Sequence, residues 1–131
     1  MKENFDKNIA DWIRDSLNQN IPKSVKALNF NLSELGFGFK SFEVDLIGSS
    51  YFDKNDEDWA CDEVWSSPKK SLIMPDDFAS NWQDCLIKTK ELLTHFIKIV
   101  DIDKDHVVAV GIGFVDGEIN IVYERSKSEK K

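Results

Sequence analysis

Hydrophobic residues recur at helical spacing in two stretches of the chain. The first stretch places its apolar residues on one face of a helix: Phe5, Ile9, Trp12, Ile13 and Leu17. The second begins after Pro75, with Asp76 or Asp77 as its N-cap, and its apolar stripe runs from Phe78 to Val100. The pattern therefore predicts two amphipathic helices, each with one buried face.

Apolar residues alternate with polar ones between the two predicted helices, which is typical of strands. Residues 25–32 fit a short strand, although Asn29 and Asn31 weaken the pattern. Residues 37–46 fit a second strand whose buried face changes sides near residues 40–41, so a bulge is expected there. A long loop is then predicted from residue 48 to residue 68.

The clearest turn signal lies after the second helix, at Asp116-Gly117. This dipeptide favours a two-residue hairpin turn and joins the strand patterns 107–115 and 118–125. A two-residue loop would place Val110 opposite Tyr123 and Ile112 opposite Ile121.

These elements follow one another in the order α-β-β-loop-α-β-β. We therefore expect an α+β fold, with a single antiparallel sheet of about four strands and both amphipathic helices packed on one face. Residues 1–125 are long enough for one such domain, and residues 126–131 are expected to form a polar, disordered tail.

Composition limits the class of protein. The 131-residue chain has 17 basic and 24 acidic side chains, for a formal net charge of -7. An acidic chain repels phosphate, so we expect binding neither to nucleic acid nor to an anionic membrane. Because no apolar run approaches the ~20 residues that span a bilayer and no signal peptide is evident, we expect a cytoplasmic protein. Cys61 and Cys85 are then expected to be free thiols.

The negative charge is concentrated in two short stretches. Residues 53–63 hold six acids and one base, and residues 101–118 hold five acids and one base. The rest of the chain is mildly basic, with a net charge of +2. Both acidic stretches fall between predicted elements.

The first acidic stretch is also rich in aromatic residues, namely Tyr51, Phe52, Trp59 and Trp65. A solvated loop has no need of four large rings, so some of them must be buried, either within the domain or by a partner. In one interpretation, Trp59 and Trp65 fold inward and hold the loop in place. In the other, the loop presents aromatic anchors within an anionic rim, a composition that suits an interface with a basic protein.

Catalytic and metal-binding motifs find no match in the chain. It lacks a phosphate-binding loop, a nucleophile elbow and a zinc-protease motif. Asp101, Asp103 and Asp105 alternate as in a calcium loop, but His106 and Ile112 stand where an EF-hand needs Gly and Glu. We therefore expect no catalytic residue, no metal site and no cofactor.

One run of residues resembles a known class of proteins. The run Asp56-Glu57-Asp58-Trp59-Ala60-Cys61-Asp62-Glu63, in a small acidic α+β chain with a Trp-bearing helix behind it, resembles bacterial immunity proteins of toxin/immunity pairs, including those of contact-dependent growth inhibition systems. The resemblance implies a non-enzymatic inhibitor that binds a cognate toxin domain and occludes its active site. The class shares no motif, so the resemblance assigns no role to a numbered residue.

The localised charge and its aromatic residues lead to one functional hypothesis. We predict a binding protein that contacts a basic toxin domain, for example a nuclease, through these residues: Asp56, Glu57, Asp58, Asp62 and Glu63 as charged contacts, with Trp59 as the apolar anchor. Two alternatives remain open. One is a small metal-dependent hydrolase that uses loop carboxylates, and the other is a homo-oligomeric adaptor that buries Ile87 and the outer face of the hairpin.

Overall fold

Two α-helices and a six-stranded sheet make up the described part of the chain. The computed structural model describes residues 2–35, 41–53, 55–74, 78–100, 106–115 and 117–125, without the side chains of residues 2–6 and 57. The helices are α1 (Lys2–Leu17), α2 (Trp82–Ile99) and the short 3-10 helix η1 (Glu57–Cys61). The strands are β1 (Ala27–Leu35), β2 (Ser41–Ser49), β3 (Glu63–Ser66), β4 (Leu72–Ile73), β5 (Ala109–Phe114) and β6 (Asn120–Glu124).

The sheet has the strand order β3-β2-β1-β5-β6, and β4 also pairs with β2. Neighbouring strands are antiparallel except at the centre, where β1 and β5 run parallel with Leu28 opposite Val110 and Phe30 opposite Ile112. The prediction of a four-stranded antiparallel sheet is therefore wrong in both the number of strands and the direction of the central pair.

Both errors have a physical origin. Strands β3 and β4 are four and two residues long, too short for an alternating pattern to stand out, and β3 lies inside the stretch predicted as a loop. Alternation also reveals which face of a strand is buried but not which strand lies beside it. The parallel pair arises because α2 carries the chain back along the sheet before β5 begins, as a crossover between parallel strands must.

Both α-helices pack on the same face of the sheet, as predicted. Their buried residues form one cluster with the apolar residues of the central strands: Ile9, Ile13, Leu17, Cys85, Leu93 and Ile97 from the helices, and Leu28, Phe30, Val44, Leu46, Val110 and Ile112 from the sheet. The Trp12 ring lies edge-on to Phe30, and its indole nitrogen donates a 2.9 Å hydrogen bond to the Lys70 carbonyl oxygen. This bond ties α1 to the segment between β3 and β4.

Helix α2 begins later than expected. Asn81 is its N-cap, and the Asn81 side chain accepts a 2.8 Å hydrogen bond from the Asp84 backbone N–H. Phe78 and Ala79 are buried but precede the helix. The predicted caps at residues 76 and 77 lie outside the described residues. The apolar stripe in the sequence begins before the helix does, because buried residues that precede a helix are apolar like those within it.

The β5–β6 hairpin starts in the predicted register and then departs from it. Val110 lies opposite Tyr123 as expected, but the register shifts at the next position, so that Gly111 faces Ile121 and Ile112 faces Asn120. Such a shift is typical of a β-bulge. Its consequence is that Ile119 and Ile121 pack on the sheet face opposite the helices. Asp116 of the predicted turn lies outside the described residues.

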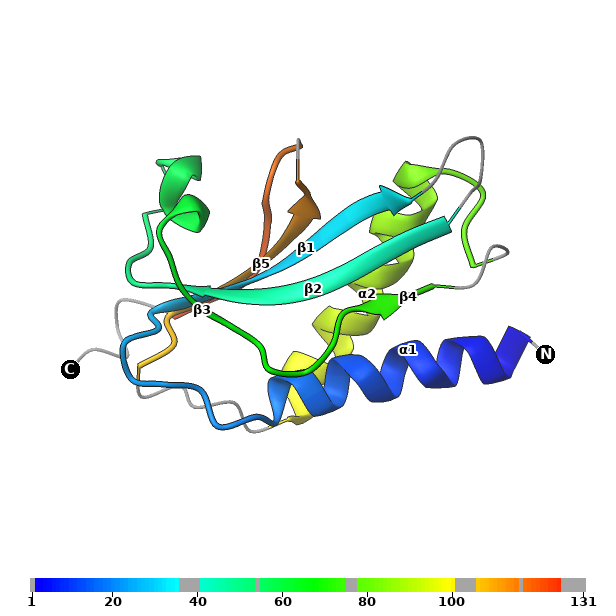
Figure 1. Ribbon diagram of the computed structural model, residues 1–131, viewed down its shortest axis with the longest axis horizontal. Coiled ribbons are helices and arrows are strands. Elements are labelled where there is room, and N and C mark those ends of the chain that lie inside the picture. The colour runs from blue at the N-terminus through cyan, green and yellow to red at the C-terminus, as the bar shows by residue number, and fades with distance from the viewer. Residues whose placement is uncertain are drawn as a thin grey trace.

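Helix η1 covers one end of this second face. Figure 1 shows η1 above the sheet and α1 below it. The indole of Trp59, only 1% exposed, packs against Ala27 and Ala109 in the sheet and meets Phe52 edge-on at 5.2 Å between ring centroids. Gly111 leaves room for Ile119, because a Cβ there would lie only 2.7 Å from Ile119 Cγ2, whereas it would make an ordinary contact of 3.4 Å with Trp59 Cζ2. Trp59 thus fastens the loop after β2 to the sheet.

Replacing Trp59 with alanine tests this attachment. We expect Trp59→Ala to lower the free energy of unfolding by about 3 kcal/mol, the usual cost of emptying the site of a large buried ring. Trp82→Ala is the matched control: Trp82 is 45% exposed, although its ring contacts Phe114, so its loss should cost no more than about 1.5 kcal/mol. Urea denaturation of both variants measures the difference, and equal losses would contradict a structural role specific to Trp59.

Candidate partner-binding site

Backbone and side-chain hydrogen bonds hold η1 in place above the sheet. The buried Ser49 hydroxyl, at the end of β2, donates a 2.5 Å hydrogen bond to the Trp59 carbonyl oxygen. At the start of η1, the Asp56 carboxylate accepts a 3.0 Å hydrogen bond from the Asp58 backbone N–H, as an N-cap does. At its end, the Asp62 N–H donates to the Trp59 carbonyl oxygen over 3.2 Å. The segment is therefore ordered by its own sequence, although it was predicted as a loop.

The acidic residues of this segment gather on one exposed surface. We define the acidic surface as the carboxylates carried by η1 and its two flanks: Asp53, Asp56, Asp58, Asp62 and Glu63. Asp56 is half-buried, and the other four are exposed. Glu57 is the first residue of η1, and its side chain is not among those that the structure describes. Four of the five charged residues that the sequence singled out therefore have described side chains on this segment, Asp56, Asp58, Asp62 and Glu63.

The predicted anchor, Trp59, lies on the inner side of η1. Its ring belongs to the interior, in agreement with the interpretation in which it folds inward and holds the segment. Trp65 is half-buried and packs against the core on the helix side of the sheet. In this conformation Trp59 supports the acidic surface from beneath and has no ring area to offer a partner.

Two other apolar side chains are exposed beside the carboxylates, Tyr51 and Val64. The Tyr51 hydroxyl donates a 3.1 Å hydrogen bond to Asp56 Oδ2. This bond raises the pKa of Tyr51, and burial and the negative charges of Asp56, Asp62 and Asp53 raise it further. Tyr51 is 41% exposed. Tyr51 therefore has the arrangement that was expected of Trp59, namely an exposed aromatic ring next to carboxylates.

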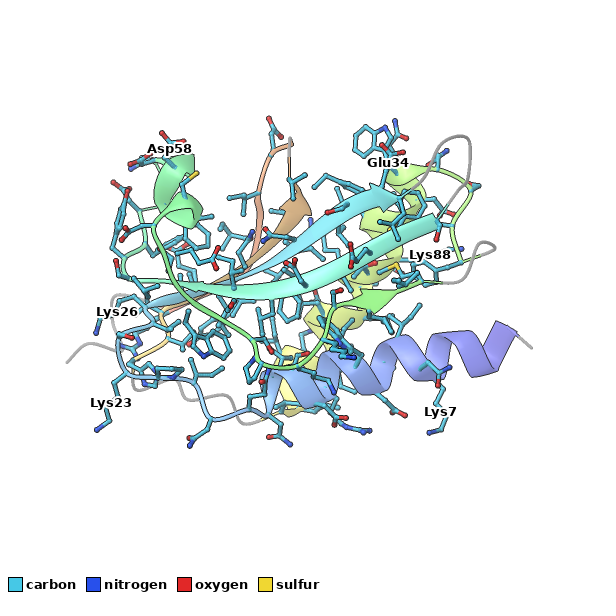
Figure 2. The ribbon with its side chains drawn as sticks, in the orientation of Figure 1. Lys7, Lys23, Lys26, Glu34, Asp58 and Lys88 are labelled. Atoms are coloured by element: carbon cyan, nitrogen blue, oxygen red, sulfur yellow. The ribbon has the colours of Figure 1, made fainter. Side chains whose placement is uncertain are left out.

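No lysine or arginine among the described residues neutralises the acidic surface. The ion pairs within that part of the chain all lie on the two α-helices: Lys7–Asp11, Arg14–Asp11, Arg14–Asp15 and Lys88–Asp84. Figure 2 shows Asp58 pointing away from the sheet on η1, whereas Lys7 and Lys23 lie on the other side of the sheet. Within the described part of the chain, the carboxylates of the acidic surface therefore face solvent without an ion-pair partner.

A polar row on the sheet itself was missed by the sequence analysis. Asn29 and Asn31 point to the face that η1 covers, and Asn31 lies opposite Asp45 in the neighbouring strand. Burial raises the pKa of Asp45, the hydrogen bond from Asn31 lowers it, and the charge of Glu43 raises it again, with a net upward shift. The signal for it in the sequence is the spacing of the two asparagines, two residues apart, which places both side chains on one face of the strand.

A small pocket joins this polar row to the acidic surface. It has a volume of about 240 Å3 and lies between η1, which contributes Asp58, Ala60 and Cys61, and the β5–β6 hairpin, which contributes Gly117 and Ile119. Asn29 and Asn31 form its base. The pocket thus combines amide groups, a carboxylate and apolar walls.

Other candidate features from the sequence are scattered in the structure. No three His, Cys, Asp or Glu side chains come together as metal ligands within the described residues. The calcium-like stretch at residues 101–105 lies outside them. Ile87 is 56% exposed on α2, while Ile119 and Ile121 of the hairpin pack in the cluster that contains Trp59. Among the described helices, none is both long and apolar enough to cross a membrane.

Comparisons with protein-family models, with curated proteins and with solved structures gave no match. The chemistry of the acidic surface and of the adjoining pocket is therefore the guide to function.

The two cysteines are expected to differ in reactivity. Cys61 is exposed in the pocket wall, whereas Cys85 is buried in the core, where burial raises the pKa of its thiol to about 12. At about pH 8, one thiol of the native protein should therefore react with Ellman's reagent, and the second should react only in urea. Mass spectrometry after native labelling checks that the modified residue is Cys61. Labelling of Cys85 under native conditions would contradict the packing of α2.

Proposed function

We propose that this protein is a non-enzymatic binding protein, an immunity-type inhibitor that neutralises a cognate basic toxin domain by contact with the acidic surface. The observation that carries the proposal is a set of exposed carboxylates on η1 and its flanks that form no ion pair with a lysine or arginine of the described residues, in a segment that the buried Trp59 ring holds to the sheet. The carboxylates of Asp58 and Glu63 are exposed and accept no hydrogen bond from the described residues, so they remain available to a basic partner.

The rigidity of the acidic surface supports binding to a protein. A flexible acidic loop loses conformational entropy when it binds, whereas η1 is already held by Ser49, by the Asp56 cap and by the Trp59 ring. Exposed Tyr51 and Val64 add apolar area next to the charges. Preorganised charge with an apolar contact nearby is what fast and specific recognition of a basic protein requires.

A basic toxin domain is the partner class that this chemistry favours. An enzyme that acts on nucleic acid must attract phosphate, so its active-site region carries positive charge. An acidic surface of complementary shape can bind this region in competition with nucleic acid, and long-range electrostatic attraction raises the rate at which the two proteins meet. The proposal assigns no reaction to the chain itself.

A charge-reversal experiment tests the proposal. Asp58 and Glu63 are exposed and their carboxylates make no hydrogen bond within the described part of the chain, so Asp58→Lys/Glu63→Lys changes charge without removing a structural contact. The matched control is Glu91→Lys/Glu124→Lys, which changes the net charge equally on α2 and β6. Wild type and control should retain the same basic polypeptide from a lysate of the source cell, and each should inhibit its enzymatic activity.

The Asp58/Glu63 variant should associate with that polypeptide about tenfold more slowly, and its association rate should depend less on salt between about 0.05 and 0.5 M. Surface plasmon resonance measures both quantities. Equal association rates for the variant and the control would remove the acidic surface from the interface. A partner without excess positive charge, or one whose activity is unchanged in the complex, would contradict the inhibitor role.

A further inference from the structure

The ring of Tyr51 is exposed and has no ring or cation against it. Two aromatic side chains are exposed in the described part of the chain, Tyr51 at 41% and Trp82 at 45%. The Trp82 ring meets Phe114 edge-on, at 5.8 Å between the ring centroids. The Tyr51 ring makes no such contact with a described ring, and the cation–π contact within that part of the chain joins Lys88 to Phe78 instead. Of the two exposed rings, only that of Tyr51 is therefore left uncovered by a described ring or cation.

Tyr51 is held in one orientation from both ends. At its backbone, the N–H group donates a 3.4 Å hydrogen bond to the buried Ser49 hydroxyl, and the next residue, Phe52, packs edge-on against Trp59. At its tip, the hydroxyl donates to the Asp56 carboxylate, which also caps η1. A ring that is already fixed loses little conformational entropy on binding, so it can serve as a contact at low cost.

Carboxylates place negative charge around the hydroxyl end of this ring. The hydrogen bond to Asp56 is the largest cause of the raised pKa of Tyr51, and burial and the charges of Asp56, Asp62 and Asp53 contribute to it as well. These three carboxylates therefore lie close enough to act on the tip of the side chain. The negative faces of an aromatic ring attract a cation that lies over them, and neighbouring carboxylates attract the same cation.

We propose that the ring of Tyr51 is the specificity-determining contact of the protein, where it receives one arginine guanidinium group of the basic partner. Arginine fits this place better than lysine, because a planar guanidinium stacks on an aromatic face and still presents N–H donors to carboxylates at its edge. Tyrosine and arginine are also enriched among the residues that dominate the energy of protein interfaces. This inference rests on the proposed function and names the contact that lengthens the lifetime of the complex.

Removing the ring without changing the charge tests this role in the complex. Tyr51→Leu keeps an apolar side chain and the net charge, so the association rate should stay within about twofold of wild type. Dissociation should become about tenfold faster, because the contact between ring and guanidinium is lost. Tyr51→Phe keeps the ring but not the hydrogen bond to Asp56, and dissociation should become about threefold faster.

Trp82→Leu is the matched control for this experiment. It removes a ring of similar exposure that lies outside the acidic surface, so neither rate should change. Surface plasmon resonance with the captured basic polypeptide measures both rates for all three variants.

A measurement without the partner tests the ring directly. The chain has two tyrosines, Tyr51 and Tyr123, so full-length protein labelled with 3-fluorotyrosine should give two 19F signals, and Tyr51→Phe identifies that of Tyr51. Tri-arginine amide should shift the Tyr51 signal saturably and leave the Tyr123 signal in place. Tri-lysine amide carries the same charge and should bind at least about threefold more weakly.

The outcomes separate this inference from the proposed function. Unchanged dissociation of Tyr51→Leu, or equal affinity of the two peptides at Tyr51, would overturn the role of the ring even if charge reversal still slowed association with the partner. A selective response of Tyr51 to tri-arginine amide supports the role of the ring, and it would do so even if no basic polypeptide were captured and the proposed function failed.

Discussion

The outer face of the sheet depends on one packing interaction, the insertion of the Trp59 ring against Ala27, Ala109 and Gly111. Small residues at these positions bring the ring close to the backbone of β1 and β5, and a Cβ at Gly111 would press on Ile119. Without the ring, η1 has little apolar area with which to stay on the sheet. The position of the acidic surface, the walls of the pocket and the covering of Asn29 all follow from this contact.

The same interaction explains why strong negative charge is compatible with a stable fold. Trp59 lies between Asp58 and Asp62 in the chain, and its ring is buried against the sheet while both acids are exposed to solvent. Exposed like charges repel one another weakly because water and salt screen them. The cost of concentrating acids in η1 is therefore small, and the burial of one large ring offsets it.

The sequence predicted the parts of the fold that depend on local periodicity. Both amphipathic helices, the β5–β6 hairpin and the exposure of Asp58, Asp62 and Glu63 were recognisable from patterns within short windows. The parallel pairing of β1 with β5 and the addition of β3 and β4 at the edge of β2 were not, because they join segments far apart in the chain. The Asn29–Asn31–Asp45 row escaped for the same reason: its meaning depends on which residues face it across strands.

The amount of charge on the acidic surface and the geometry of that charge have different physical effects on recognition. An uncompensated acidic surface attracts any basic protein, so by itself it raises association rates but discriminates little between partners. Geometry discriminates more sharply, because carboxylates held in place by the Trp59 ring and the Asp56 cap pair only with cations of matching spacing, and a partner without them leaves charges unpaired. The combination of localised charge with a fixed scaffold therefore separates the rate of encounter from the choice of partner, and a change in either can alter one property while the other is retained.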